Sequence, residues 1–203
     1  MNVTLLDYGA GNVTSVERAL HRLGVGSSRA STPETIASAE VLLLPGVGHY
    51  ATLIRALDER ALRQPLLAAI GRGAPFLGIC LGLQALYQSS EEALELDGLE
   101  LFPGEVRALP AKVKLPHMGW NQLSIKRSSR MLANIPADAY FYFAHSYAAI
   151  ESNSGCGSVA TCTHGAEFVA VLEKENIFAV QFHPEKSGAA GAQILRNFLG
   201  LPA

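Results

Sequence analysis

The sequence contains little cysteine, little net charge and no long apolar run. Its three cysteines are an odd number in a 203-residue chain long enough to be stable without staples, which indicates reduced thiols rather than a disulfide framework. The formal net charge is −2 and the basic residues are scattered, so there is no basic stripe that would bind a phosphate backbone. No segment has the apolar length of a membrane span, and the first residues lack the basic start of a signal peptide. We therefore expect a soluble, cytoplasmic protein without nucleic-acid or membrane partners.

Signals of metal chemistry are equally scarce. The six histidines are dispersed, no His-Glu-X-X-His string occurs, and Cys156 and Cys162 have no companion pair at zinc-site spacing. We expect neither a metal nor another cofactor, and a structural role for these two cysteines.

The first half of the chain alternates short apolar runs with helical stretches. With 49% hydrophobic residues, the chain can bury one large core but not two full-sized ones, so one domain over residues 1–203 is expected. The first helix should end near Leu23-Gly24, where the glycine is a suitable C-terminal cap. The apolar runs at 3–7, 41–46 and 75–80, each followed by a helix, predict a parallel sheet flanked by helices.

The second half has the pattern of antiparallel strands. A short turn at 174–176 joins two of them, and a closing helix is expected from about Ser187 to Leu199. The strands themselves are expected around 139–149, 156–163, 167–173 and 177–182. The predicted fold class is therefore α/β: a single domain with a central, largely parallel sheet flanked by helices and an antiparallel extension in the second half.

A candidate nucleophile ends the apolar run at 75–80. Cys80 stands in a Gly-X-Cys-X-Gly turn between a buried strand and a helix expected to continue through Tyr87, which is the cysteine form of the nucleophile elbow. A side chain at Gly78 or Gly82 would collide with the neighbouring strand or helix. Unpaired N–H groups at the helix start favour the thiolate and can hold an oxyanion. The alternative is that Cys80 is a small buried hydrophobe, as many free cysteines are.

A candidate base follows the last apolar run. His183 would project from the edge of the sheet, and Glu185 can accept a hydrogen bond from its second ring nitrogen, with Pro184 stiffening the link. A lone histidine is more often a structural residue. The His-Pro-Glu string and the cysteine elbow together favour a triad of Cys80, His183 and Glu185.

With these two motifs, the chain resembles the class I, triad-type glutamine amidotransferases over essentially its whole length. Within them it is similar to the glutaminase subunits of imidazole glycerol phosphate synthases, which are enzymes of histidine biosynthesis. The segments that carry this resemblance are DYGAGN at 7–12, PGVG at 45–48, HMGWN at 117–121, YFAHSY at 142–147 and HPEK at 183–186.

The resemblance implies hydrolysis of glutamine to glutamate and ammonia. Cys80 would attack the side-chain amide, His183 would protonate the departing ammonia, and water would resolve a glutamyl thioester. The residues implied to bind glutamine are Gly48, Gln84, His145 and Ser146, and those implied for the oxyanion hole are Val47, Gly48 and Leu81. Without the resemblance, Gln84 would be interpreted as a solvated helix residue.

The loop at 46–48 departs from many related glutaminases, which have two adjacent glycines there. If the Val47 peptide rests in the wrong orientation, the free subunit has an incomplete oxyanion hole, and one lost donor costs roughly 100- to 1,000-fold in rate. A partner that turns this peptide would then activate the enzyme.

The resemblance also implies a heterodimer. In this family, ammonia passes through the interface to a (β/α)8-barrel synthase subunit, which forms imidazole glycerol phosphate and an aminoimidazole carboxamide ribotide. The interface residues that it implies are Asn12, Trp120, Tyr142 and Lys186. Taken alone, Trp120 fits core packing, Tyr142 an alternating strand and Lys186 a solvated surface charge.

Three other functions stay open at this point. A glutaminase subunit of another pathway, such as pyridoxal phosphate synthase, shares the triad but not the DYGAGN and HMGWN strings. A stand-alone cysteine hydrolase or peptidase would act without a partner and would not need Gln84. A non-catalytic regulatory subunit would often have lost a member of the triad.

Overall fold

The computed structural model describes residues 2–10, 12–150 and 157–202. The strands of its central sheet are β1 (Asn2–Leu6), β2 (Gly26–Ala30), β3 (Leu42–Gly46), β4 (Phe76–Cys80), β8 (Ser124–Ile125), β11 (Ser158–His164), β12 (Ala166–Lys174) and β13 (Ile177–Val180). They lie in the order β2-β1-β3-β4-β13-β12-β11-β8. From β2 to β13 all neighbours are parallel, and from β13 to β8 they are antiparallel.

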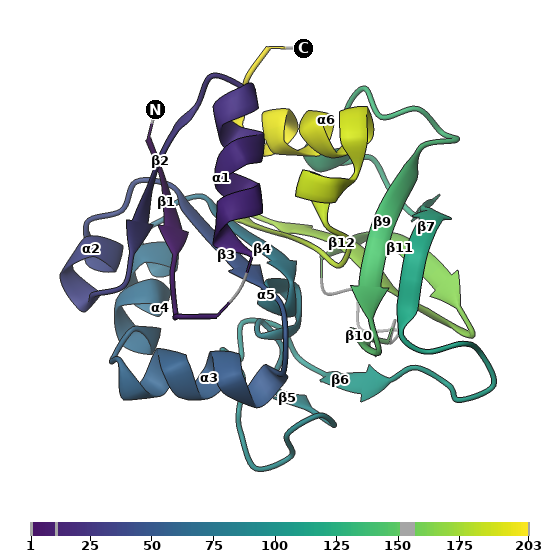
Figure 1. Cartoon of the computed structure of the whole chain (residues 1–203), viewed down its shortest axis with the longest axis horizontal. Helices are drawn as coiled ribbons and strands as arrows, with labels where there is room; N and C mark the ends of the chain where they lie inside the picture. Colours follow the sequence, from purple (N-terminus) through teal and green to yellow (C-terminus); the bar gives the residue numbers. More distant parts are fainter. Residues whose placement is uncertain (1, 11, 151–156, 203) are drawn as a thin grey trace.

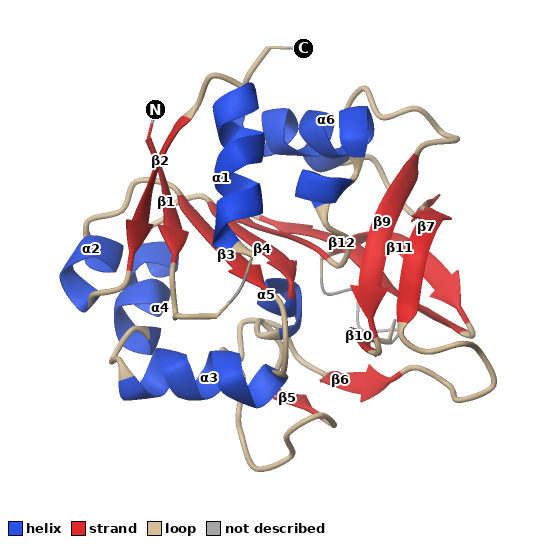
Figure 2. Cartoon of the chain, viewed as in Figure 1, coloured by secondary structure: helices blue, strands red, loops and turns tan. Residues whose placement is uncertain are grey.

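Helices cover both faces of this sheet (Figures 1 and 2). One face carries α1 (Val13–Arg22) and α6 (Gly188–Leu199), and the other carries α2 (Pro33–Ala37), α3 (Tyr50–Glu59) and α4 (Arg63–Gly71). Every residue of β3 and β4 is buried because both layers cover them, which explains their continuous apolar sequence. Within the described residues, no helix has the length and apolar character to cross a membrane.

Two smaller sheets lie beside the central one. One contains β5 (Ser89–Ser90), β6 (Glu105–Ala108) and β10 (Tyr147–Ala149), and in the other β7 (His117–Gln122) pairs antiparallel with β9 (Tyr140–His145). Figure 1 shows β7 and β9 as a twisted ribbon on the β11 side of the molecule. Three short helical turns complete the chain: α5 (Leu81–Gln84), η1 (Arg130–Leu132) and η2 (Pro184–Lys186).

The predicted fold class is confirmed, and the first and last helices lie where they were expected. The strand expected at 139–149 breaks at Ser146 into β9 and β10, which belong to different sheets. The single helix expected between β3 and β4 is two helices, α3 and α4. β2 was not expected, because only Ala30 among its residues is buried and this edge strand has no apolar run.

Candidate active site

Three neighbouring parallel strands end at the same edge of the sheet. β4 lies between β3 and β13, with Cys80 opposite Gly46 of β3. Because the carboxyl ends of parallel strands meet at one edge, the segments that follow these strands converge, and ligands of α/β sheets bind there. The loop after β3 contains the expected oxyanion donors, the turn after β4 contains Cys80, and the segment after β13 contains His183.

Cys80 lies in a strained turn between β4 and α5. Its φ of +55° and ψ of −106° are rare for a residue with a side chain and cost about 1–3 kcal/mol. A Cβ on Gly78 would lie 2.5 Å from the carbonyl oxygen of Gly82, and a Cβ on Gly82 would collide with the carbonyl oxygen of Leu44 in β3. The collisions expected at these two glycines are therefore confirmed.

The helix after Cys80 is only one turn long. α5 ends at Gln84, so the expectation that it continues through Tyr87 is wrong. The carbonyl oxygen of Ala85 accepts a hydrogen bond from the N–H of Leu99 at 2.7 Å instead of one from a further helical turn. Because the helix dipole is a sum over aligned peptides, so short a helix supplies little of the positive potential expected at the sulfur.

His183 and Glu185 form a buried pair next to Cys80. Nδ1 of His183 lies 2.9 Å from Oε1 of Glu185, and the two side chains are 2% and 1% exposed. Burial by itself lowers the pKa of His183, but hydrogen bonds with Cys80 and Glu185 outweigh it and raise this pKa to about 10. His183 is therefore protonated at neutral pH. The turn η2, which Pro184 begins, brings the two side chains together.

A cavity of about 640 Å³ opens beside Cys80. Its lining contains residues from the whole length of the chain. Expected site residues in its lining are Asn12, Val47, Gly48, Cys80, Leu81, Gln84, His145, Ser146, His183 and Lys186. Glu185, Trp120 and Tyr142 are not part of the lining.

Glu92 is a lining residue that the sequence motifs did not indicate. Its Oε2 accepts a hydrogen bond from the N–H of Tyr50 at the start of α3, at 2.8 Å. It lies in no recognisable motif, and an acidic pair such as Glu91-Glu92 resembles an ordinary solvated surface segment. Only the tertiary structure brings this carboxylate to the cavity.

Backbone contacts hold the polar side chains around the cavity. Gln84 is buried rather than solvated, and its Nε2 donates to the carbonyl oxygen of Tyr147 at 2.7 Å. Nδ1 of His145 donates to the same oxygen at 2.9 Å, and its Nε2 lies 3.1 Å from Nδ1 of His117. Burial lowers the pKa of His145 to about 3 and that of His117 to about 4, so both rings are neutral at pH 7. Both ring nitrogens of His145 are thus already engaged within the protein.

The loop after β3 contains the expected oxyanion donors. Gly46 approaches α5 so closely that a Cβ would lie 2.6 Å from Cβ of Leu81, and Gly48 has a φ of +96°. The Val47 carbonyl oxygen accepts a hydrogen bond from the Tyr8 hydroxyl at 3.5 Å. Because the peptide is planar and trans, the N–H of Gly48 points away from Tyr8. Burial raises the pKa of Tyr8 to about 12, so its hydroxyl remains a donor at neutral pH.

Three of the expected interface residues contact one another. Trp120 and Tyr142 are cross-strand partners in β7 and β9, with ring centroids 5.9 Å apart. Nζ of Lys186 lies 5.6 Å from the centroid of the Tyr142 ring, and Lys186 belongs to the lining of the cavity. Trp120 is 55% exposed and Met118, on the same strand, is 66% exposed, so Trp120 is not a core residue. An exposed apolar group of this kind is typical of interaction surfaces.

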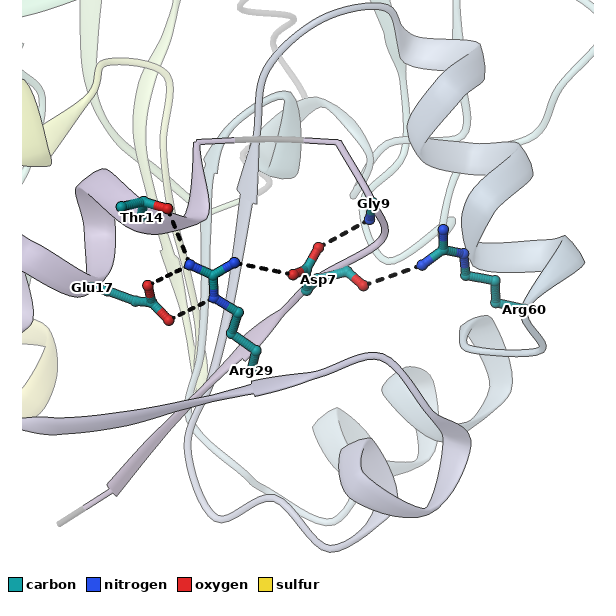
Figure 3. A network of polar contacts seen from close by, with 6 residues as sticks. All are labelled: Asp7, Gly9, Thr14, Glu17, Arg29 and Arg60. Atoms are coloured by element: carbon teal, nitrogen blue, oxygen red, sulfur yellow. Dashed lines mark hydrogen bonds and ion pairs between the residues drawn. The ribbon is translucent and has the colours of Figure 1, made fainter.

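A polar network holds Asp7 and Gly9, which follow β1 (Figure 3). Arg29 of β2 donates to both carboxylate oxygens of Glu17 in α1, at 2.8 and 2.6 Å, and lies 3.5 Å from the carboxylate of Asp7. Asp7 accepts a hydrogen bond from the N–H of Gly9 at 3.0 Å. The network joins β2 and α1 to the residues that follow β1.

Cys162 differs from Cys80 in its surroundings. Cys162 is free and buried, and burial raises its pKa to about 12, so it stays a neutral thiol at physiological pH. Cys156, like Gly11 of the DYGAGN segment, lies outside the described residues.

The fold and the cysteine elbow define the class of protein. The chain belongs to the class I glutamine amidotransferase family, whose family model matches residues 4–200. It is 46% identical over 197 residues to imidazole glycerol phosphate synthase subunit HisH of Methanothermobacter thermautotrophicus, covering 97% of each chain. It is 43% identical over 200 residues to the chloroplastic imidazole glycerol phosphate synthase hisHF of Arabidopsis thaliana, covering 97% of this chain and 34% of that protein.

A solved structure described as a glutamine amidotransferase agrees with this fold. It superposes with a TM-score of 0.78 at 18% identity, covering 98% of this chain and 97% of that one. At this identity the likeness concerns the fold alone. The predicted family is confirmed by the family model and by the relatives, which are similar over nearly the whole chain.

Proposed function

We propose that this chain is the glutaminase subunit of an imidazole glycerol phosphate synthase. It hydrolyses glutamine to glutamate and ammonia, and a synthase partner consumes the ammonia. The observation that carries the proposal is the convergence of Cys80, His183 and Glu185 at one sheet edge, beside a cavity of about 640 Å³. A cavity of this size suits a small-molecule substrate. The relatives named HisH, similar over nearly their whole length, support the assignment to this synthase.

Cys80 and His183 supply the chemistry, with Glu185 holding the histidine. The thiolate of Cys80 attacks the side-chain carbonyl carbon of glutamine, and N–H groups of the loop after β3 and of Leu81 hold the oxyanion. His183 gives its proton to the nitrogen as the C–N bond breaks, so ammonia leaves and a glutamyl thioester remains. The neutral His183 then takes a proton from water, whose oxygen attacks the thioester and releases glutamate and the thiolate.

Glutamine binding uses the charged and polar groups of the lining. Free glutamine has an α-ammonium group, and Glu92 is a lining carboxylate that can pair with it. Because the Nε2 of Gln84 is engaged by the backbone, its Oε1 is the end that can accept a hydrogen bond from the substrate. The other proposed contacts are with Gly48, Ser146 and the backbone of His145.

The Val47 loop is the part of the site that a partner can adjust. Its hydrogen bond with Tyr8 is weak, at 3.5 Å, so little hydrogen-bond energy is lost when this peptide turns. An oxyanion hole that lacks one donor loses roughly 100- to 1,000-fold in rate. We therefore place the control of glutamine hydrolysis at Val47 and Gly48.

The partner is a (β/α)8-barrel synthase subunit that binds over Asn12, Trp120, Tyr142 and Lys186. Asn12 and Lys186 belong to the lining of the cavity, so a partner on this surface would receive ammonia directly. The barrel uses the ammonia to form imidazole glycerol phosphate and an aminoimidazole carboxamide ribotide in the cytoplasm. The name hisHF of the Arabidopsis thaliana relative, of which this chain matches 34%, supports such an association.

The test is glutamate release from glutamine by the purified chain, alone and with a barrel synthase subunit and its nucleotide ligand. We expect a rate near zero alone that rises by orders of magnitude in the complex, and no turnover after Cys80→Ala at unchanged fold. A high rate alone, unaffected by the barrel, would assign the triad to another pathway. Absence of turnover in both conditions would contradict the glutaminase proposal.

A further inference from the structure

Gln181 is a fully buried polar residue in contact with the sulfur of Cys80. It follows β13, its side chain is 0% exposed, and its Nε2 lies 3.5 Å from Sγ of Cys80. The steps of glutamine hydrolysis described above do not use it. A buried amide is costly unless its hydrogen bonds are made, so this contact needs an explanation.

The orientation of the Gln181 amide follows from its neighbours. Nε2 of Gln84 donates both to the Tyr147 carbonyl oxygen, at 2.7 Å, and to Oε1 of Gln181, at 3.2 Å. Since a carbonyl oxygen can only accept, the nitrogen of Gln84 must face Tyr147, and the oxygen of Gln181 must face Gln84. The NH2 group of Gln181 is thereby directed at the sulfur and has no freedom to exchange places with the oxygen.

Besides the contact with His183, a thiolate at Cys80 gains from such a donor because the helix dipole is weak here. The helix that starts at Cys80 is one turn long and contributes little dipole. Donation to a charged acceptor is stronger than donation to a neutral one, so an N–H aimed at the sulfur favours thiolate over thiol. The proton that leaves Sγ goes to the ring nitrogen of His183 that does not contact Glu185.

We propose that Gln181 is a further catalytic residue, which stabilises the Cys80 thiolate by donating a hydrogen bond, and that Gln84 positions it. This inference rests on the proposed role of Cys80 as the nucleophile. It gives Gln84 a second task besides substrate binding: its nitrogen orients Gln181, while its oxygen is left to accept from the substrate. Losing a hydrogen bond to a charged group should reduce the thiolate fraction by roughly tenfold.

The experiment measures the rate at which iodoacetamide alkylates Cys80 as a function of pH, in the full chain. Mass spectrometry of the peptide that contains Cys80 separates it from Cys156 and Cys162. Gln181→Met keeps the length of the side chain and removes the donor, Gln84→Met releases the Gln181 amide, and Val180→Ala is a control that loosens the same strand without touching the amides. Thermal unfolding is recorded for each, and glutamate release with the synthase partner is measured in parallel.

We expect the midpoint of the alkylation profile to rise by about one pH unit in Gln181→Met, by less in Gln84→Met, and not at all in Val180→Ala. An unchanged midpoint in a folded Gln181→Met, with the wild-type chain active in glutamate release, would overturn the role of Gln181 alone. If Gln181→Met does not fold, an unchanged midpoint in Gln84→Met overturns it. An inactive wild-type complex would instead contradict the proposed glutaminase function.

Discussion

Replacing Glu185 with Gln isolates the charge of the residue that holds His183. Oε1 of Glu185 lies 2.9 Å from Nδ1 of His183, whereas Oε2 is buried without a hydrogen-bond partner among the described residues. Glutamine has the same shape and can still accept from Nδ1 through its oxygen. The change therefore keeps the ring orientation, removes the negative charge, and buries an NH2 group that has no acceptor.

The size of the effect follows from the pKa of His183. The rise from the ordinary value of 6.5 to about 10 corresponds to a net effect of roughly 5 kcal/mol, in which the contacts with Cys80 and Glu185 outweigh burial. Removing one nearby opposite charge lowers a pKa of this kind by roughly 1–3 pH units. Because the folded pKa lies above the unfolded one, the pairing stabilises the fold fully below about pH 6.5 and is lost as the pH rises through about 10. In Glu185→Gln this loss should be complete at a lower pH.

NMR titration of the His183 ring in Glu185→Gln and in the wild type tests this directly. Glutamate release in the complex with the synthase should fall by roughly 100- to 10,000-fold, the range for impaired proton transfer. Glu173→Gln is a matched control, because its carboxylate accepts a hydrogen bond from the N–H of Met131 at 3.1 Å, away from the cavity. Identical His183 titrations in wild type and Glu185→Gln would refute the assignment of the raised pKa to this pair.

Three further predictions concern packing, substrate binding and the partner surface. Gly82→Ala should lower the free energy of unfolding, measured in urea, by roughly 1–3 kcal/mol, because the added Cβ meets the Leu44 carbonyl oxygen. Gly71→Ala is the control and should not lower this free energy, because there is open space around Gly71. Equal losses in both variants would contradict the packing argument. Glu92→Gln should raise KM for glutamine roughly tenfold with little change in kcat. Glu91→Gln is the control and should leave KM unchanged, because Glu91 is next to Glu92 but absent from the lining. A similar KM in both variants would remove Glu92 from the binding site. Trp120→Ala should weaken binding of the barrel subunit, measured by calorimetry, roughly 30-fold or more, and should leave the free energy of unfolding within about 0.5 kcal/mol of the wild type. Ile125→Ala is the control and should bind normally, since Ile125 is 50% exposed but lies on β8. Unaltered binding by Trp120→Ala would place the interface elsewhere.

The sequence was informative where the signal is local. The turn at Cys80 needs small residues at Gly78 and Gly82, which are two positions away on either side, and the contact of His183 with Glu185 spans two residues. Buried strands such as β3 and β4 are short apolar runs because helices cover both their faces. Each of these patterns depends on neighbours along the chain, so each can be recognised without knowing the fold.

The prediction was poorer where distant segments compete for the backbone. α5 stops after one turn because the carbonyl oxygen of Ala85 accepts a hydrogen bond from Leu99 instead of from the next turn. The break at Ser146 arises because β9 pairs with β7 while β10 pairs with β6. Helix and strand propensities contain no information about such partners, which approach from elsewhere in the chain.

By itself, the sequence determined the fold class and the local motifs around Cys80 and His183, since these depend on hydrophobic periodicity and on short spacings. It indicated the family through the motif strings that resemble those of known glutaminases. The tertiary structure decided which groups share the cavity. It brought Glu92 to the lining, directed the Gln181 amide to the sulfur through Gln84 and the Tyr147 carbonyl, and left Trp120 exposed beside Tyr142 and Lys186. These contacts join residues far apart in the chain, and their geometry exists only once the sheet has set the relative positions of β4, β13 and the β7–β9 pair.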